Sequence, residues 1–346
     1  MLHVGLDLSR RRLDYIALAA DGTDVVVGAA PPDADGLRGL GRRLARHGEP
    51  IAAVIESMTG ARFVHDTLEL LGWEVEIADA QRVRGIAPLA TKTDRIDARV
   101  LAELSRLDLV PAIWLPDPAV RAERERARFR LFLVRQRVRL KQRVHSTLMA
   151  WGRPCPLTDL FGARGRELLA GLEIPEPWRS HIATAVQLID DTDREISVID
   201  EELRRVAACH PCVSLLRTVP GIGPVLGYTI AAEIGRIERF ASPTKLAGYT
   251  GLCPRVYQSG DSDRRGALSK HGPRYLRWAL IEAAVSACRN PLYRERYERT
   301  RRRLGRQRGP RVAQVELARR LAHSIWQMLT RGETFAPKGA SVALAA

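Results

Sequence analysis

Two aspartates, Asp94 and Asp97, stand three residues apart in the stretch TKTDRIDARV. Two other acids, Asp7 in HVGLDLS and Glu56 in IAAVIES, interrupt or end apolar runs. Residues three apart in a helix occupy neighbouring positions on one face, and carboxylate oxygens suit Mg²⁺ and Mn²⁺. The four acids therefore predict a site for two divalent cations, which can activate a nucleophile and stabilise a leaving oxygen at phosphorus.

The aspartate pair also has a purely structural explanation. Thr93 is a suitable helix N-cap, and Asp94 in the first turn is favoured by the helix dipole. Asp97 could pair with a nearby arginine, and Asp7 could hydrogen-bond to a turn at a strand edge. The pair by itself favours capping. The four acids together, in this order across a pattern of strands, favour the metal site.

The composition indicates a partner with many negative charges. The 346 residues include 45% hydrophobic and 27% charged residues, with a formal net charge of +15 and a pI of about 10.3. Lysine and arginine displace counterions from phosphates, so DNA or RNA is the expected partner. No apolar run reaches the roughly 18 residues that span a bilayer. The apolar stretch in the first residues, MLHVGLDLSRRR, is too short for a signal peptide. We expect no membrane association and a cytoplasmic location.

The five cysteines do not form a recognisable framework. An odd number without a secretion signal argues against disulfides. Cys209 and Cys212 form a CxxC pair, but no second pair stands at the spacing of a zinc site. The sequence predicts reduced thiols.

The first 110 residues show the alternation of an α/β domain. The stretches HVGLDLS, RLDYIALA and DVVVGAA are expected to form three consecutive antiparallel strands. This order of elements resembles the ribonuclease-H-like fold, in which the first and fourth strands are adjacent and would bring Asp7 and Glu56 together. A helix carrying Asp94 and Asp97 would pack beside them. Strands are expected over 3–9, 12–19, 24–30, 51–57 and 73–80, and helices over 35–48, 61–72 and 93–107.

Residues 119–206 have the pattern of a helical middle segment. An arginine-dense helix is followed by the proline-containing stretch 151–162 and by a second long helix with a heptad-like seam, in which Asp193 is a polar break. This pattern predicts a helical hairpin or coiled coil. The arginines of the first helix fit either a solvated face or a phosphate contact. The seam comprises Ile182, Val186, Ile189, Ile196, Leu203 and Val206.

A third, mainly α-helical segment, 207–335, begins with two apolar helices around the turn PGIGP. This is the pattern of a helix-hairpin-helix, in which the backbone N–H groups of Gly221 and Gly223 would bind a phosphate without reading base sequence. An ordinary tight turn between helices is the alternative.

Several motifs together resemble one family, the DEDD-type insertion-sequence transposases related to pilin-gene invertases. GLDLS, VIES and KTDRIDARVLAEL carry Asp7, Glu56, Asp94 and Asp97. TVPGIGPVLGYTIAAEIG, RFASPTKLAGYTGLCPRVYQSG and GALSKHGPRYLRWALIEAA follow in the family's order. The resemblance covers nearly the whole chain, and it is least diagnostic in the helical middle.

The resemblance implies a RuvC-like N-terminal domain, 1–110, that binds Mg²⁺ or Mn²⁺ through the four acids. It also implies a catalytic serine in the C-terminal domain. The matching residue is Ser259, which would attack DNA and form a covalent phosphoserine link. Members act as oligomers, so a dimer or tetramer is expected, and a noncoding RNA can bridge donor and target DNA. By spacing alone, Ser259 would be a serine in the polar turn SGDSDRRG.

Basic residues flank both groups of motifs. Lys92 and Arg95 stand beside the acids, and Arg264, Arg265 and Lys270 follow the serine. They are candidates for phosphate contact, with a solvated surface as the alternative for each one. Two other functions remain open: a structure-specific nuclease of the Holliday-junction resolvase type, and a nucleic-acid-binding protein without activity.

Overall fold

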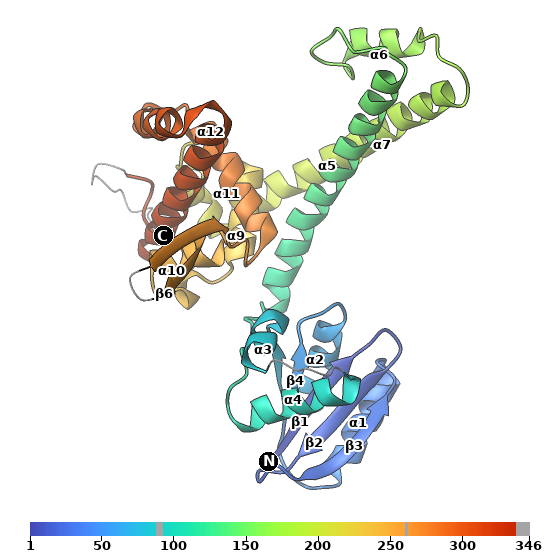
Figure 1. Ribbon diagram of the computed structural model, residues 1–346, viewed down its shortest axis with the longest axis vertical. Helices are drawn as coiled ribbons and strands as arrows, with labels where there is room; N and C mark the ends of the chain where they lie inside the picture. Colours follow the sequence, from blue (N-terminus) through green and yellow to red (C-terminus); the bar gives the residue numbers. More distant parts are fainter. Residues whose placement is uncertain (88–92, 260–261, 337–346) are drawn as a thin grey trace. The chain divides into compact units, whose positions relative to one another are not determined.

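The computed structural model describes residues 1–87, 93–259 and 262–336 (Figure 1). The chain divides into two compact units, Met1–Leu115 and Pro116–Ala346. The first unit is a mixed α/β domain, as predicted. Its elements are β1 (Leu2–Leu8), β2 (Leu13–Leu18), β3 (Asp24–Ala30), α1 (Ala34–Ala45), β4 (Ile51–Glu56), α2 (Ala61–Glu69), β5 (Glu74–Ala78), α3 (Ala80–Ile86) and α4 (Asp94–Arg106).

The five strands of the first unit lie in the order β3-β2-β1-β4-β5. The three consecutive strands at the start of the chain are antiparallel, whereas β1 with β4 and β4 with β5 are parallel. The predicted adjacency of the first and fourth strands is therefore confirmed. The chain enters β4 from α1 and enters β5 from α2, and such helical connections allow strands to pair in parallel.

The two faces of this sheet are covered by different helices. Leucines of α1 and α2 join the alternate strand residues Val4, Leu6 and Ile55 in the main core of the unit. The opposite face packs on α4, whose Leu101 belongs to a smaller apolar cluster with Val54. Both faces of the central strands are thus buried, which accounts for the nearly continuous apolar run of β4.

One glycine sets how closely α4 approaches the sheet. A Cβ atom built on Gly5 in β1 would lie 1.8 Å from the carbonyl oxygen of Ala98 and 2.5 Å from the nitrogen of Ala102. Only a residue without a side chain fits against the helix backbone at this point. The contact therefore fixes α4 directly over β1.

The second unit is mostly helical. Its two long helices, α5 and α7, pack side by side with α6 near one end, so the two helices of the predicted middle segment are paired within the chain (Figure 1). A core of apolar residues from α7, α8, α9, α11 and α12 fills its remaining part. The elements are α5 (Pro118–Ala150), α6 (Ala163–Ala170), α7 (Trp178–Cys209), α8 (Pro211–Leu216), α9 (Pro224–Ile234), the short 3-10 helix Ile237–Arg239, α10 (Pro243–Tyr249), β6 (Pro254–Ser259), β7 (Ser262–Leu268), α11 (Arg274–Ala287) and α12 (Pro291–Arg331).

Arginines spaced along α5, namely Arg126, Arg130 and Arg137, bind acidic side chains of α7. Arg137 donates a hydrogen bond to Asp193, the polar break of the predicted seam. Arg126 donates to Glu202 at 3.1 Å, and Arg130 forms an ion pair with Asp200. Helix pairing therefore accounts for three of the arginines of α5, an explanation that the sequence pattern did not suggest.

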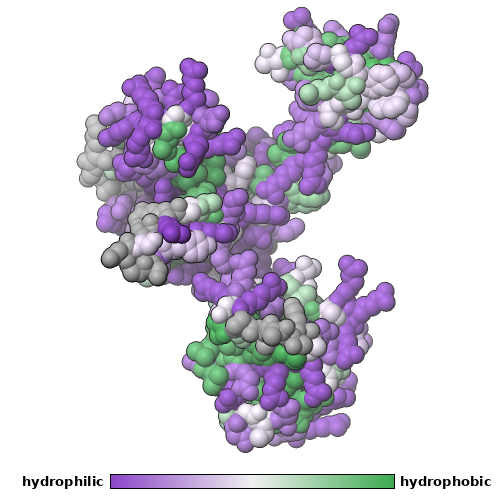
Figure 2. Space-filling model, in the orientation of Figure 1, coloured by the Kyte–Doolittle hydropathy of each residue, from purple (hydrophilic) through white to green (hydrophobic). Residues whose placement is uncertain are grey.

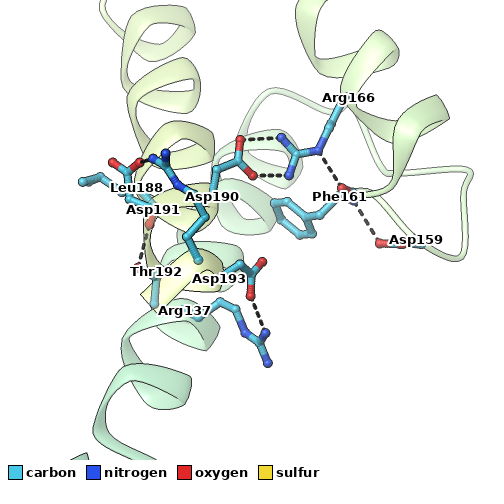
Figure 3. A network of polar contacts seen from close by, with 10 residues as sticks. Arg137, Asp159, Phe161, Arg166, Leu188, Asp190, Asp191, Thr192 and Asp193 are labelled. Atoms are coloured by element: carbon cyan, nitrogen blue, oxygen red, sulfur yellow. Dashed lines mark hydrogen bonds and ion pairs between the residues drawn. The ribbon is translucent and has the colours of Figure 1, made fainter. Parts of the chain in front are cut away.

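The tip of the paired helices is tied by a similar network (Figure 3). Arg166 of α6 points its guanidinium at the carboxylate of Asp190 in α7, with one contact of 2.6 Å. The same side chain donates to the carbonyl oxygen of Phe161 at 2.8 Å. The hydrogen bond and the charge of Asp190 raise the pKa of Arg166, and those of Arg166 lower the pKa of Asp190.

Two other arginines of α5 hold the C-terminal end of α9. Arg124 donates to the carbonyl oxygens of Ala232 at 2.9 Å and of Glu233 at 2.6 Å. Arg128 makes a two-pronged contact of 2.7 and 3.0 Å with the carboxylate of Glu233, which is fully buried. Positive charge at a helix C-terminus is favourable, and these contacts satisfy carbonyl groups that the helix leaves open.

No helix among the described residues has the length and apolar character needed to cross a membrane. All five cysteines are free thiols, in agreement with the sequence prediction.

We predict that Gly5→Ala destabilises the first unit. The added Cβ must push α4 away from β1, so the free energy of unfolding should fall by about 3 kcal/mol. Urea denaturation of the full-length protein measures the change. Gly39→Ala in α1 is the matched control, because a Cβ at Gly39 meets no atom within 4 Å. It should raise stability by roughly 0.5–1 kcal/mol, and an equal loss in both variants would contradict the packing argument.

Arg128→Met should destabilise the second unit far more than Arg137→Met. The first change leaves the charge of Glu233 buried without its partner, at a cost of about 3 kcal/mol. The second removes the ion pair with Asp193, whose two side chains are 30% and 41% exposed, so the change should stay within about 1 kcal/mol. Thermal unfolding followed by circular dichroism distinguishes the two. Equal melting temperatures would show that the buried pair does not hold α9.

Candidate active site

Two of the four predicted acids lie at the same end of the central strands. Leu6 of β1 pairs with Ile55 of β4 in the parallel register, so Asp7 and Glu56 follow at the next position of each strand. Because side chains alternate along a strand and Leu6 and Ile55 belong to the core on the α1 and α2 side, Asp7 and Glu56 lie on the α4 side. Both are half-buried.

The direction in which α4 runs across the sheet places the other two acids, Asp94 and Asp97, near the same end. At the start of β1, the ring nitrogen Nδ1 of His3 lies 3.0 Å from the hydroxyl of Ser105, near the end of α4. The helix therefore runs opposite to β1 across this face. The end of β1 with Asp7 consequently lies toward the first turn of α4, which contains Asp94 and Asp97.

The predicted N-cap at the start of α4 is confirmed. The Thr93 hydroxyl accepts a hydrogen bond of 3.3 Å from the backbone N–H of Ile96. Asp94 is exposed and Asp97 is half-buried, and both stand in the first turn, where the helix dipole favours negative charge. The cap thus fixes where the helix starts and, with it, the position of both aspartates.

A fifth carboxylate, Asp14, belongs to this region and was missed from the sequence. It pairs directly with Asp7 in the antiparallel register of β1 and β2, and it is only 9% exposed. Arg12 holds it through two-pronged contacts of 2.8 to 3.0 Å. The hydrogen bond and charge of Asp14 raise the pKa of Arg12, and the charge of Asp94 adds to the effect. The position of an acid inside the apolar run LDYIAL is the sequence feature that could have identified Asp14 as a candidate site residue.

The donor set fits a hard divalent cation by its chemistry, since carboxylate oxygens are the ligands that Mg²⁺ and Mn²⁺ take. In the described ranges, however, no three side chains of His, Cys, Asp or Glu gather in an arrangement that would hold a metal ion. The backbone brings the acids to one end of the sheet, and their side chains must move together for a cation to be held.

Ser259 lies in the second unit, as the last residue of strand β6. It pairs with Ser262, the first residue of β7, across the end of a β-hairpin. The sequence pattern alone indicated a polar turn here, and the hairpin was not predicted. The side chains of Ser259 and Arg265 lie outside the described part of the structure, whereas Arg264 is exposed on β7 opposite Tyr257.

The loop after this hairpin holds Lys270 in an unusual backbone conformation. Its φ of 53° lies in the left-handed region, which a residue with a Cβ rarely adopts. Arg277 of α11 donates to the carbonyl oxygens of Thr250 at 3.1 Å and of Lys270 at 3.2 Å. These contacts keep the exposed Lys270 at a fixed place on the loop.

The remaining predicted phosphate-binding residues have varied surroundings. Gly221 has φ of 90° and packs against α11, where a Cβ would lie 2.4 Å from the carbonyl oxygen of Ala283. Gly223 is the N-cap residue of α9, and a Cβ there would meet no atom within 4 Å. Arg95 is exposed in the first turn of α4. Lys92 lies outside the described residues.

Comparison with known proteins finds two family models that match the chain. Residues 4–151, which include all four acids, match a DEDD-type transposase model of the IS110 group. Residues 213–298, which include Ser259, match the model described as the IS116/IS110/IS902 transposase family. The two matches share no residue and follow each other along the chain. Together they define a transposase, a class of enzyme that cleaves and rejoins DNA.

The chain is a DEDD-type insertion-sequence transposase, similar over these two segments to the IS116/IS110/IS902 family. It is 27% identical over 299 residues to the transposase for insertion sequence element IS1328 of Yersinia enterocolitica, an alignment that covers 83% of this chain and 86% of that protein. It is also 27% identical over 291 residues to the transposase for element IS1111A of Coxiella burnetii, with coverage of 82% and 78%.

We predict that the N-cap residue of α4 contributes more to the stability of the fold than the acid Asp94 beside it. Thr93→Ala should lower the free energy of unfolding by about 1 kcal/mol, because the N–H of Ile96 loses its partner. Thr93→Ser keeps the acceptor and should match the wild type. Asp94→Asn should change stability by less than about 1 kcal/mol. Chemical denaturation compares the three, and a loss in Thr93→Ser equal to that in Thr93→Ala would refute the capping assignment.

Proposed function

We propose that this transposase cuts and rejoins DNA by attack of Ser259 on a phosphodiester, assisted by divalent cations held by Asp7, Glu56, Asp94 and Asp97. The observation that carries the proposal is the arrangement of the first unit, where the ends of two parallel strands and the start of α4 bring the acids to one end of the sheet. The order β3-β2-β1-β4-β5 supports a RuvC-like, ribonuclease-H-like assignment for this domain.

The second unit supplies the nucleophile in this proposal. The oxygen of Ser259 gives up its proton and attacks phosphorus, and the bond from phosphorus to the leaving strand breaks as a serine phosphodiester forms. The leaving hydroxyl takes a proton. A strand hydroxyl then gives up its proton and attacks the same phosphorus, the bond from phosphorus to Ser259 breaks, and the serine oxygen takes a proton. The phosphodiester bond energy is kept throughout, so the strand is rejoined without ATP. Bound Mg²⁺ or Mn²⁺ would supply neutralisation of phosphate charge and activation of the attacking oxygen.

The protein's own side chains position the phosphate in this scheme. A serine hydroxyl is a weak nucleophile near neutral pH, so its activation must come from its surroundings. We propose that basic residues of both units bind phosphate: Lys92 and Arg95 of the first unit, and Arg264, Arg265 and Lys270 of the second. Lys270 is supported best, because Arg277 holds its backbone in place. Gly223 at the N-terminus of α9 has open space for a phosphate, whereas the packing of Gly221 favours a structural role.

Partners beyond DNA follow from the family resemblance. We propose that a noncoding RNA bridges donor and target DNA and that the chain works as an oligomer. The formal net charge of +15 supports a large nucleic-acid surface.

The proposal predicts that Asp7→Asn, Asp97→Asn and Ser259→Ala each lower recombination by at least ~10³-fold in a cell-based excision assay, because each removes a group that acts on the reacting phosphate. Ser262→Ala is the matched control, since Ser262 pairs with Ser259 across the same hairpin. It should retain activity.

A second measurement tests the covalent step. Denaturing gels should show DNA attached to the wild-type protein and to Ser262→Ala, and none attached to Ser259→Ala. Full recombination by Ser259→Ala would overturn the serine mechanism. Nicks with free ends and no protein-linked DNA in the wild type would instead favour a resolvase-type nuclease.

A further inference from the structure

Helix α12 folds back on itself and lines a groove. Its backbone is non-helical at Gly305, with φ of 74° and ψ of 178°, so the helix consists of two arms on either side of this residue. The arms and the segment up to Ala336 line a hollow of about 1030 Å³. We call it the α12 groove. In the space-filling view, hydrophilic side chains crowd the surface of α12 (Figure 2).

The arm of α12 that follows Gly305 presents a row of polar and basic side chains to the groove. Arg319, His323, Gln327 and Arg331 recur every four residues, so they share one face of the helix. The opposite face of this arm carries leucines and alanines that enter the core of the unit. The first arm adds further cations, including Arg303.

Acidic residues neutralise only part of this charge. Glu316 accepts 2.8 and 2.9 Å hydrogen bonds from Arg296 and the hydroxyl of Thr300, which join the two arms. Glu333 lies 4.0 Å from Arg331. The groove therefore keeps a surplus of positive charge.

Three arginines that line the groove, Arg303, Arg319 and Arg320, form no ion pair with a carboxylate among the residues described. The Nε atom of Arg319 is buried and has no hydrogen-bond partner there. Burial and the charge of Arg296 lower the pKa of Arg320, and the opposing effect of Glu316 does not cancel them. An anion in the groove would offer Arg303 and Arg319 a negatively charged partner and would add to the effect of Glu316 on Arg320.

We propose that the α12 groove binds the phosphodiester backbone of a single nucleic-acid strand. A guanidinium fork matches two phosphate oxygens in geometry and charge. The volume lies near the upper limit for small-ligand pockets, roughly 300–1,000 Å³, which suits a short length of one strand. An acidic peptide shares the charge, but DNA is the polyanion on which the family acts. The site goes beyond the cleavage chemistry and does not depend on it.

The test uses the full-length protein with fluorescent single-stranded DNA and RNA of the same sequence, in buffer with EDTA so that cleavage does not contribute. Arg303→Gln combined with Arg319→Gln should weaken binding. The slope of log K against log salt should shrink by about 0.7 for each phosphate that the variant no longer neutralises. The single variant Arg303→Gln repeats the binding measurement with a change at an exposed position, which should leave the folded core intact.

The matched control is Arg299→Gln combined with Arg302→Gln. These residues belong to the same arm but line a separate surface hollow, and the change in net charge is identical. Weaker binding by the groove variants than by the control pair, for either DNA or RNA, supports the proposal, and the stronger probe identifies the natural strand. Labelled poly-glutamate is measured in parallel as an acidic peptide. Equal effects in both pairs, unchanged binding by the groove variants, or weaker binding of poly-glutamate alone would overturn the proposal. Thermal melting checks that each variant is folded.

Discussion

The backbone contact between α4 and β1 at Gly5 is the constraint on which the candidate active site depends. The carbonyl of Ala98 lies where a side chain on Gly5 would have to be. This close approach fixes the helix over the central strand, and the His3–Ser105 contact gives its direction. The first turn of α4 then comes to the end of β1 that holds Asp7. Acids that are far apart in the chain reach one region because two backbones touch.

Arginine has two different uses in this protein, and its burial and partners separate them. In α5, Arg128 binds the buried carboxylate of Glu233, and neighbouring arginines pair with acids of α7, so this charge serves the helical framework. In the α12 groove, Arg303 and Arg319 have no such carboxylate among the described residues. The net charge predicted a polyanionic partner, but it contained no information on which arginines were free to meet one.

Several features of the fold and site were predictable because they follow from local patterns. The alternation in HVGLDLS and the apolar run IAAVIES predicted two strands that carry Asp7 and Glu56. The predicted adjacency of these strands, which followed from the resemblance of the element order to the ribonuclease-H-like fold, is present in the sheet. Thr93 was predictable as a cap because capping involves only nearby residues. Asp14 was missed, since its pairing with Asp7 depends on the register of two strands. The β6–β7 hairpin was also missed, because SGDSDRRG has the composition of a loop.

The sequence by itself determined the types of group available: four acids in a recognisable order, a serine in a motif, and a large excess of arginine. It also determined the family, since the motifs are local strings of residues. Only the tertiary structure decided which groups meet. Contacts such as Gly5 with Ala98, Arg128 with Glu233 and the two arms of α12 join residues by packing and register. Such contacts depend on complementary shape and charge across the fold, which no single stretch of sequence contains.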